Sequence, residues 1–186
     1  MTGFMREIFG LVCGQNPSHT WAPGGELLPL CQRCTGLYVG AALALLLLVV
    51  CRPPLDVRYR WLHALLLLAM APFGFHLVPH GEVLRTMSGQ WFGFGVVGLF
   101  WLLPGKCWKD RYRWQPSLRS YLLLGTISMI SVPVFARWGG VVAAVTLSWL
   151  AMAGLAVIAG LLFGNMILLA YIMISWFRRQ TGAAAS

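Results

Sequence analysis

Charged side chains are scarce in this sequence. Lys, Arg, Asp and Glu together make up 10% of its 186 residues, whereas soluble domains carry about 25% charged residues. Hydrophobic residues make up 59% of the chain, and the mean hydropathy is +0.73. Most of the chain must therefore face lipid or other apolar segments, so the composition excludes an ordinary soluble domain and predicts a membrane protein.

Acidic residues are the rarest charged group. The chain has 5 Asp and Glu residues against 14 Lys and Arg residues, with a formal net charge of +9. None of the acids lies inside a long apolar run, which argues against a proton-relay transporter. The basic residues cluster between the apolar runs, the pattern that orients membrane proteins. Nucleic acid is therefore not an expected partner, whereas anionic lipid is the expected partner of the basic loop 106–119.

The N-terminal region lacks targeting signals. The first apolar run begins only after Cys34, so the early apolar core of a signal peptide is missing. Gly3 is not at the position that myristoylation requires. Five cysteines are too few for a disulfide-built scaffold. Residues 1–12 form at most a short amphipathic helix, which is expected to lie in the membrane interface.

Long apolar runs are what the chain does contain. A bilayer core about 30 Å thick needs roughly 20 apolar residues per spanning helix. Prolines and glycines such as Pro104-Gly105 are expected to end these runs. The predicted fold is an all-α polytopic transmembrane helix bundle of about five spans, with a Cys-containing interfacial segment at 1–33, a membrane domain at 34–179 and a tail at 180–186. The expected spans are 34–51, 61–78, 85–103, 120–136 and 141–177.

The last apolar block, 141–177, is too long for one perpendicular span. As a single helix it would measure about 55 Å. It forms either one long tilted helix or two halves that reverse near 160–165. Five spans place most basic residues, including Arg178 and Arg179, on one side, which favours the single helix. The same charge bias predicts that the N-terminus lies outside and the C-terminus lies in the cytoplasm. The expected location is the bacterial inner membrane.

This topology gathers reactive side chains on the outer face. Cys31-Gln32-Arg33-Cys34 is a C-x-x-C sequence, which lets both sulfurs face one point, as a metal site or a redox pair requires. A tetrahedral zinc site needs one or two further ligands. We therefore expect zinc as the metal, with its ligands drawn from Cys13, Cys31, Cys34, His19 and His76.

Two other interpretations of the cysteines remain open. A disulfide could act as a static clasp that holds the N-terminal loop in place, in an accessory subunit of a larger membrane complex. Alternatively, Cys13 could exchange with the C-x-x-C pair in a membrane thiol–disulfide oxidoreductase. No pattern in the sequence establishes whether the protein is an enzyme.

An anionic-ligand pocket is expected beside the cysteines. Arg85 opens the third span and can bind a phosphate or carboxylate bidentately, or simply anchor the helix at the interface. Gln90 could share this pocket or bond between helices. His80 is a third candidate, although Pro79 disturbs the helical spacing that would align it with His76. A lipid headgroup is one expected ligand, with metal-assisted hydrolysis or transfer as the chemistry.

Two glycine pairs have the spacing of close helix contacts. Gly89 and Gly93 lie four residues apart in the third span, and Gly160 and Gly164 repeat that spacing in the last apolar block. Glycines at this interval let two helix backbones approach closely. These residues are expected to pack helices together, either within the bundle or against partner membrane subunits.

The cysteine motifs resemble those of an uncharacterised family of prokaryotic polytopic membrane proteins. Its members show Cys-His-Gln-x-Pro, then Cys-x-Arg-Cys-Thr-Gly-x-Tyr-x-Gly at the start of the first span. Here the matching segments are 13–17, which reads Cys-Gly-Gln-Asn-Pro, and 31–40, which reads Cys-Gln-Arg-Cys-Thr-Gly-Leu-Tyr-Val-Gly. A later signature is matched at 84–89. Gly14 stands where the family has histidine. The family has no settled activity, so the resemblance implies the architecture and the position of the site.

Overall fold

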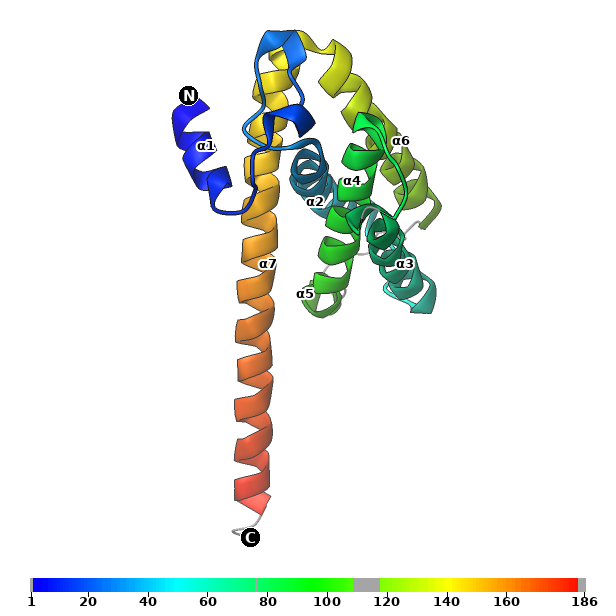
Figure 1. Cartoon of the computed structure of the whole chain (residues 1–186). Helices are drawn as coiled ribbons and strands as arrows, with labels where there is room; N and C mark the ends of the chain where they lie inside the picture. The colour runs from blue at the N-terminus through cyan, green and yellow to red at the C-terminus, as the bar shows by residue number, and fades with distance from the viewer. Residues whose placement is uncertain (1, 76, 109–117, 184–186) are drawn as a thin grey trace.

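The structure is a computed structural model that describes residues 2–75, 77–108 and 118–183. The described residues form helices and contain no strand, so the predicted all-α fold is confirmed (Figure 1). Two short 3-10 helices, η1 (Pro17–His19) and η2 (Pro23–Gly25), lie in the N-terminal loop. The α-helices are α1 (Thr2–Gly10), α2 (Gln32–Cys51), α3 (Val57–Gly74), α4 (Glu82–Phe100), α5 (Leu102–Trp108), α6 (Leu118–Trp138) and α7 (Gly140–Ala183).

Local sequence explains where several helices begin and end. Arg52 closes α2 in the left-handed conformation, and the two prolines that follow cannot continue the helix. Asp56 caps α3 by accepting the Tyr59 backbone N–H at 2.9 Å. The expected stop at Pro104-Gly105 is wrong, because both residues lie inside α5. Proline is tolerated there because the first turn of a helix needs no N–H partner.

Long helices occupy all five expected spans, and three of them are long and apolar enough to cross a membrane. These are α2, α6 and residues Gly140–Arg178 of α7. Helix α3 carries Arg58 and Arg60 in its first turn, and α4 begins with Glu82 and Arg85, which lowers the hydropathy of both. Membrane crossing by α3 and α4 therefore stays a prediction.

Helix α2 lies at the centre of the bundle and packs against α4, α6 and α7. Glycines set its closest approaches. A Cβ added at Gly89 of α4 would collide with the Arg33 carbonyl oxygen, and one at Gly93 would collide with that of Leu37. A Cβ at Gly154 of α7 would collide with the Tyr38 carbonyl oxygen. The α2–α4 contact therefore uses the first expected glycine pair.

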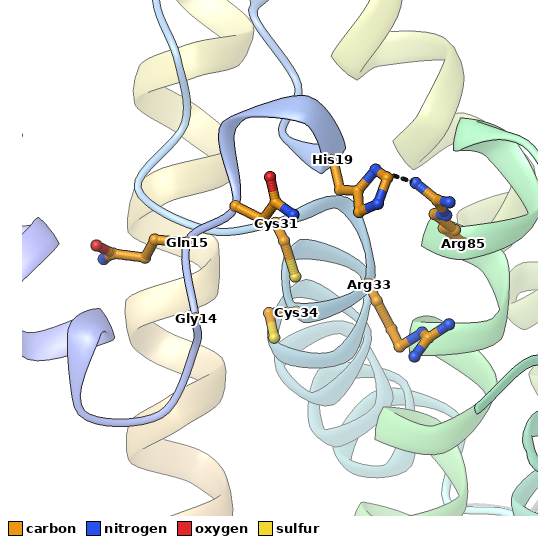
Figure 2. Close-up of a pocket in the computed structure, with 8 residues that line it drawn as sticks. Gly14, Gln15, His19, Cys31, Arg33, Cys34 and Arg85 are labelled. Atoms are coloured by element: carbon orange, nitrogen blue, oxygen red, sulfur yellow. Dashed lines mark hydrogen bonds between the residues drawn. The ribbon is translucent and has the colours of Figure 1, made fainter. Parts of the chain in front are cut away.

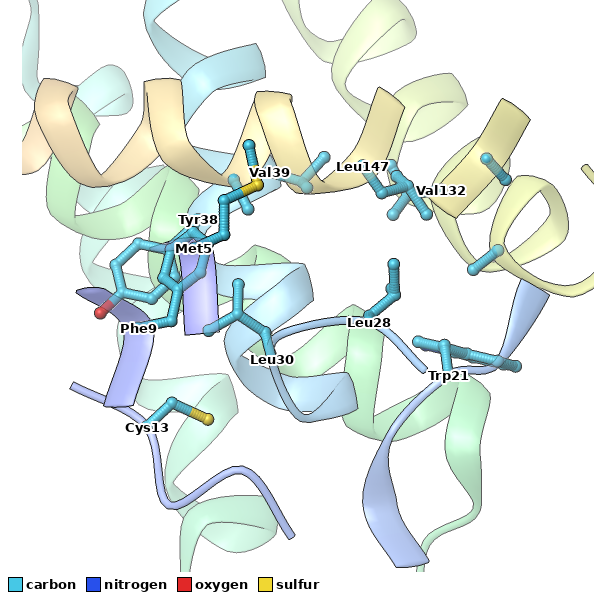
Figure 3. Close-up of a cluster of buried hydrophobic side chains, with 13 residues drawn as sticks. Met5, Phe9, Cys13, Trp21, Leu28, Leu30, Tyr38, Val39, Val132 and Leu147 are labelled. Atoms are coloured by element: carbon cyan, nitrogen blue, oxygen red, sulfur yellow. The ribbon is translucent and has the colours of Figure 1, made fainter. Parts of the chain in front are cut away.

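The N-terminal segment is part of the hydrophobic core. Phe9 of α1 is fully buried and lies 6.0 Å, centroid to centroid, from Tyr38 of α2. Met5, Leu28 and Leu30 join the same cluster, which also includes side chains of α6 and α7 (Figure 3). The segment is held by packing against the helices, in addition to any contact with the membrane interface.

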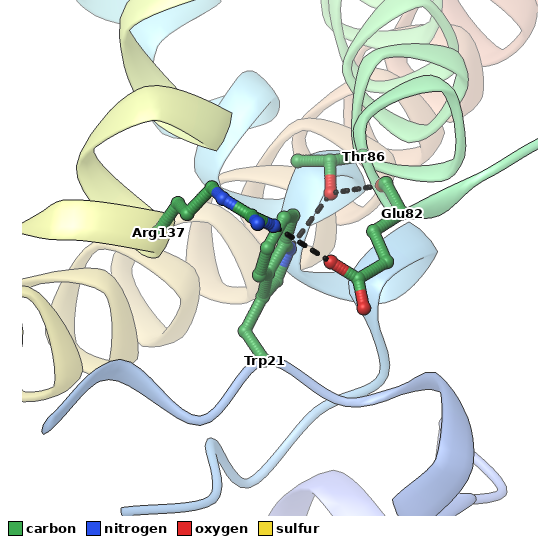
Figure 4. Close-up of polar contacts among 4 residues, drawn as sticks. All are labelled: Trp21, Glu82, Thr86 and Arg137. Atoms are coloured by element: carbon green, nitrogen blue, oxygen red, sulfur yellow. Dashed lines mark hydrogen bonds and ion pairs between the residues drawn. The ribbon is translucent and has the colours of Figure 1, made fainter. Parts of the chain in front are cut away.

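Polar contacts join the N-terminal loop to α4, and α4 to α6. The buried Trp21 Nε1–H donates to Thr86 Oγ1 at 2.8 Å, and the Thr86 hydroxyl donates to the Glu82 carbonyl oxygen at 3.1 Å (Figure 4). Arg137, near the end of α6, forms an ion pair with the Glu82 carboxylate at 3.6 Å. The loop, the start of α4 and the end of α6 are thus held together at one end of the bundle.

Helix α7 is a single continuous helix, so the structure contains no reversal near residues 160–165. Its first half packs against α2, and its second half extends beyond the bundle (Figure 1). Large apolar side chains such as Phe163, Ile167 and Tyr171 are more than half exposed there. Asn165 donates to the Phe100 carbonyl oxygen at 2.9 Å, near the point where α7 leaves the bundle.

Candidate metal centre

Three cysteines from two separate segments meet beside the start of α2. Cys13 follows α1, Cys31 is the N-cap residue of α2, and Cys34 lies in the first turn of that helix. Their sulfur atoms all lie within 4.8 Å of one another. The loop between them is pinned, because Thr20 and Cys31 form an antiparallel bridge and the Leu28 N–H donates to the Trp21 carbonyl oxygen at 2.9 Å. Packing of the loop therefore places Cys13 next to the C-x-x-C pair.

Hydrogen bonds favour a thiolate at Cys13. The thiols of Cys31 and Cys34 donate to it and hold its pKa well below the ordinary value, in spite of partial burial. The backbone N–H groups of Gln15 and Cys31 also point to its sulfur, at 3.4 and 3.5 Å. The same interaction with Cys13 raises the pKa of Cys31. The cluster therefore favours negative charge on Cys13, beside thiols whose protons a bound metal would displace. The three cysteines are free thiols.

Other candidate ligands lie near the sulfur atoms without joining them. Among the described residues, no histidine or carboxylate belongs to the three-sulfur group. The His19 Nδ1 atom is hydrogen-bonded to the Arg85 guanidinium (Figure 2). The Gln15 side chain points away and donates to the carbonyl oxygens of Arg6 and Pro29, at 2.7 and 3.0 Å. His76 lies outside the described residues. The described part of the chain thus brings together three sulfur atoms that could hold a metal ion, without a fourth ligand beside them.

A cavity of about 270 Å³ lies beside the cysteines. Two arginines, Arg33 and Arg85, line this cavity together with Cys31 and Cys34. Its lining residues are Gly14, Gln15, Asn16, His19, Cys31, Arg33, Cys34 and Arg85 (Figure 2).

Neither arginine of the cavity forms an ion pair with a carboxylate of the described residues. One Arg33 nitrogen, Nη2, donates to the Phe73 carbonyl oxygen at 2.8 Å and contacts His80 Nε2 at 3.2 Å. Since His80 Nδ1 lies 2.7 Å from the Val78 carbonyl oxygen, it carries the proton, and Nε2 accepts from Arg33. His80 therefore holds the Arg33 guanidinium by a hydrogen bond, and it is not one of the residues that line the cavity. Sequence reasoning missed Arg33 as a site residue, although it lies between the two cysteines of the C-x-x-C.

Gln90 lies away from the cavity. It is fully buried, its Nε2–H donates to the Ser128 carbonyl oxygen of α6 at 3.2 Å, and it packs against Gly40 of α2. It follows Arg85 by five residues, which turns its side chain about 140° around the helix. The structure therefore places Gln90 in a contact between helices, which was the alternative to a ligand-binding role.

The fold and the cluster define a helical membrane protein with a three-cysteine group that can hold a metal ion. Residues 13–100 match the family described as "Predicted membrane protein (DUF2085)". This stretch includes Cys13, Cys31, Cys34, Arg33 and Arg85, and the expected resemblance to an uncharacterised family of membrane proteins is confirmed. The function of that family is not known. No curated protein and no solved structure matches the chain.

Proposed function

We propose that Cys13, Cys31 and Cys34 bind one zinc-type metal ion whose fourth coordination position faces the cavity. The observation that carries the proposal is the approach of three sulfur atoms to within 4.8 Å of one another. Thiolate ligands select zinc and other soft metals over magnesium and calcium. Structural zinc sites are usually closed by four protein ligands, whereas sites that act on a ligand keep one position open.

We expect an anionic ligand at the open coordination position. Arg33 and Arg85 line the same cavity, and their hydrogen-bond partners are a backbone carbonyl and imidazoles. No carboxylate of the described residues lies within ion-pair distance of either guanidinium. An anion bound between the metal ion and the arginines would balance this positive charge.

Elemental analysis of the purified full-length protein tests the metal site. The wild-type protein should contain about one zinc ion per chain, because the three thiolates coordinate a single ion. Cys31→Ser should remove most of the zinc. Cys51→Ser is the matched control, since Cys51 lies at the other end of α2, away from the cluster. A wild-type protein with no stoichiometric metal and three titratable thiols would refute the site, as would a disulfide between Cys13 and either partner.

A second candidate function is that of an accessory subunit, with α7 as its contact surface. A Cβ added at Gly160 or Gly164 would meet no atom within 4 Å, so this glycine pair is unused inside the protein. The pair Gly89 and Gly93, with the same spacing, is filled by α2. Replacement of Gly160 by leucine should therefore disrupt association with a partner subunit, and it should leave zinc binding unchanged.

A further inference from the structure

We infer that the cavity beside the cysteines binds the phosphate group of a membrane lipid, with the apolar part of the lipid outside the cavity. The inference rests on the proposed metal centre, because the phosphate would lie between the open metal position and the two arginines. It names the class of ligand that the proposed function leaves open.

The charge of the cavity favours phosphate. The one carboxylate near Arg85 on its own helix is Glu82, and it forms its ion pair with Arg137 instead. Arg33 in addition has a buried Nε–H without a hydrogen-bond partner in the structure. A guanidinium presents paired N–H donors that match two oxygens of a phosphate group. Two arginines without a carboxylate therefore form a suitable site for a group with several negative oxygens.

The start of α2 adds to this anion site. The sulfur of its N-cap residue, Cys31, interacts with the backbone N–H of Cys34 in the first turn, so this helix start already favours a negative group. The backbone N–H groups and the helix dipole favour negative charge at such an end. Cys31 and Cys34 both line the cavity, which places this helix start at its wall.

The size of the cavity limits what it can enclose. At about 270 Å³ it is smaller than the roughly 300–1,000 Å³ of pockets that enclose a drug-sized molecule. A lipid headgroup phosphate can enter, but the acyl chains must remain outside. The ligand would thus have a charged end inside the protein and an apolar end on its surface.

Exposed apolar side chains are the sequence neighbours of the charged residues. Leu11 and Val12, which directly precede Cys13, are 86% and 45% exposed. Leu84, next to Arg85, is 39% exposed, and Leu77, close to the Arg33 partner His80, is 73% exposed. A soluble anion would make no contact with these apolar side chains, whereas the acyl chains of a lipid would pack against them.

The depth of the cavity in the membrane also favours a lipid. Helix α2 is apolar and long enough to cross the bilayer, and the cavity lies at its first turn. The ends of a spanning helix lie where the hydrocarbon core meets the headgroups. The phosphates of the lipids would therefore lie at the level of the cavity.

Binding of soluble short-chain probes to the zinc-loaded full-length protein in detergent tests this inference. The probes are dioctanoyl phosphatidic acid, dioctanoyl glycerol, glycerol 3-phosphate and inorganic phosphate, and binding is followed by native mass spectrometry. Only dioctanoyl phosphatidic acid should bind tightly. Arg85→Gln should weaken its binding about tenfold or more, because it removes a charge-assisted contact. Arg6→Gln, which removes an exposed charge of α1 outside the cavity, should leave the affinity unchanged.

The zinc content of every sample separates this inference from the proposed metal centre. Arg85→Gln with normal zinc and weakened phosphatidic acid binding supports the inference, and Arg85→Lys should restore only part of the affinity. Equal binding of inorganic phosphate would overturn the lipid as the ligand, and equal binding of dioctanoyl glycerol would overturn the phosphate. Normal zinc without any phosphatidic acid binding would refute the inference and leave the metal centre standing. Absence of zinc in the wild type would refute the metal centre itself.

Discussion

Arg33 shows how a single residue connects helix packing to the site. Its carbonyl oxygen faces Gly89 of α4, while its guanidinium lines the cavity and bonds the Phe73 carbonyl oxygen near the end of α3. The residue lies between Cys31 and Cys34 in sequence. A shift of α2 relative to α4 would therefore move both the cysteines and an arginine of the anion site. The close α2–α4 contact is thus a requirement for the geometry of the site.

Gly89→Ala tests this connection. The added methyl group would collide with the Arg33 carbonyl oxygen, and overpacking of this kind costs about 1–3 kcal/mol. We expect a lower thermal unfolding midpoint in detergent and weaker zinc retention against a chelator. Gly164→Ala is the matched control, because its methyl group would meet no atom within 4 Å. Equal stability of the two variants would show that α2 and α4 are not as close as the structure indicates.

At the scale of elements, α7 differs from every other helix of the bundle. Its apolar part, Gly140–Arg178, contains 39 residues and measures about 58 Å at 1.5 Å per residue, whereas the hydrocarbon core is about 30 Å thick. Tilts of up to about 40° cannot absorb that difference. Part of the helix therefore extends out of the hydrocarbon core, where its apolar side chains would be buried only by contact with another protein. The second half of α7 carries these exposed side chains.

The glycine pair of α7, Gly160 and Gly164, is the expected contact site for a partner subunit. The wild-type protein, extracted in a mild detergent, should migrate on a native gel with a partner subunit, and Gly160→Leu should release it because leucine keeps two helices apart. Ala170→Leu makes a similar small-to-large change at an exposed position of the same helix and should have no effect. Identical migration of wild type and Gly160→Leu would argue against α7 as a contact surface.

At the scale of the whole molecule, charge is distributed unequally between the two ends of the bundle. Arg58, Arg60, Lys106 and Arg119 are exposed near the end opposite to the cysteines. Basic residues accumulate on the cytoplasmic side of membrane proteins, where anionic lipids attract them. This distribution predicts that the cysteine cluster and its cavity face away from the cytoplasm.

Labelling of intact cells with an impermeant thiol reagent tests this orientation. Leu27→Cys introduces an exposed thiol in the N-terminal loop, and Arg58→Cys introduces one at the start of α3. The thiol at position 27 should react on intact cells, and the thiol at position 58 should react only after permeabilisation. Unmodified protein serves as the background control. The reverse pattern would place the cysteine cluster on the cytoplasmic side.

Local properties of the sequence determined the class of the protein and much of its helical organisation. Hydropathy and proline positions place α2, α6 and α7 close to their true bounds, because an apolar run in lipid must satisfy its backbone hydrogen bonds internally, as a helix does. Pro104 was misjudged, since its effect depends on whether it opens a helix or interrupts one. The position of the site at Cys31 and Cys34 was also visible, because the C-x-x-C spacing is itself local.

Only the tertiary structure decided which distant residues share the site. Cys13 joins the pair because Phe9 and the loop 20–31 pack into the core. His19 and His80 lie beside arginines, and Gln90 faces another helix, which no spacing rule distinguishes from a ligand-binding role. A polar side chain near a membrane interface forms a hydrogen bond with whichever group the tertiary packing places beside it. That choice depends on the paths of loops and on helix contacts, which hydropathy and spacing do not encode.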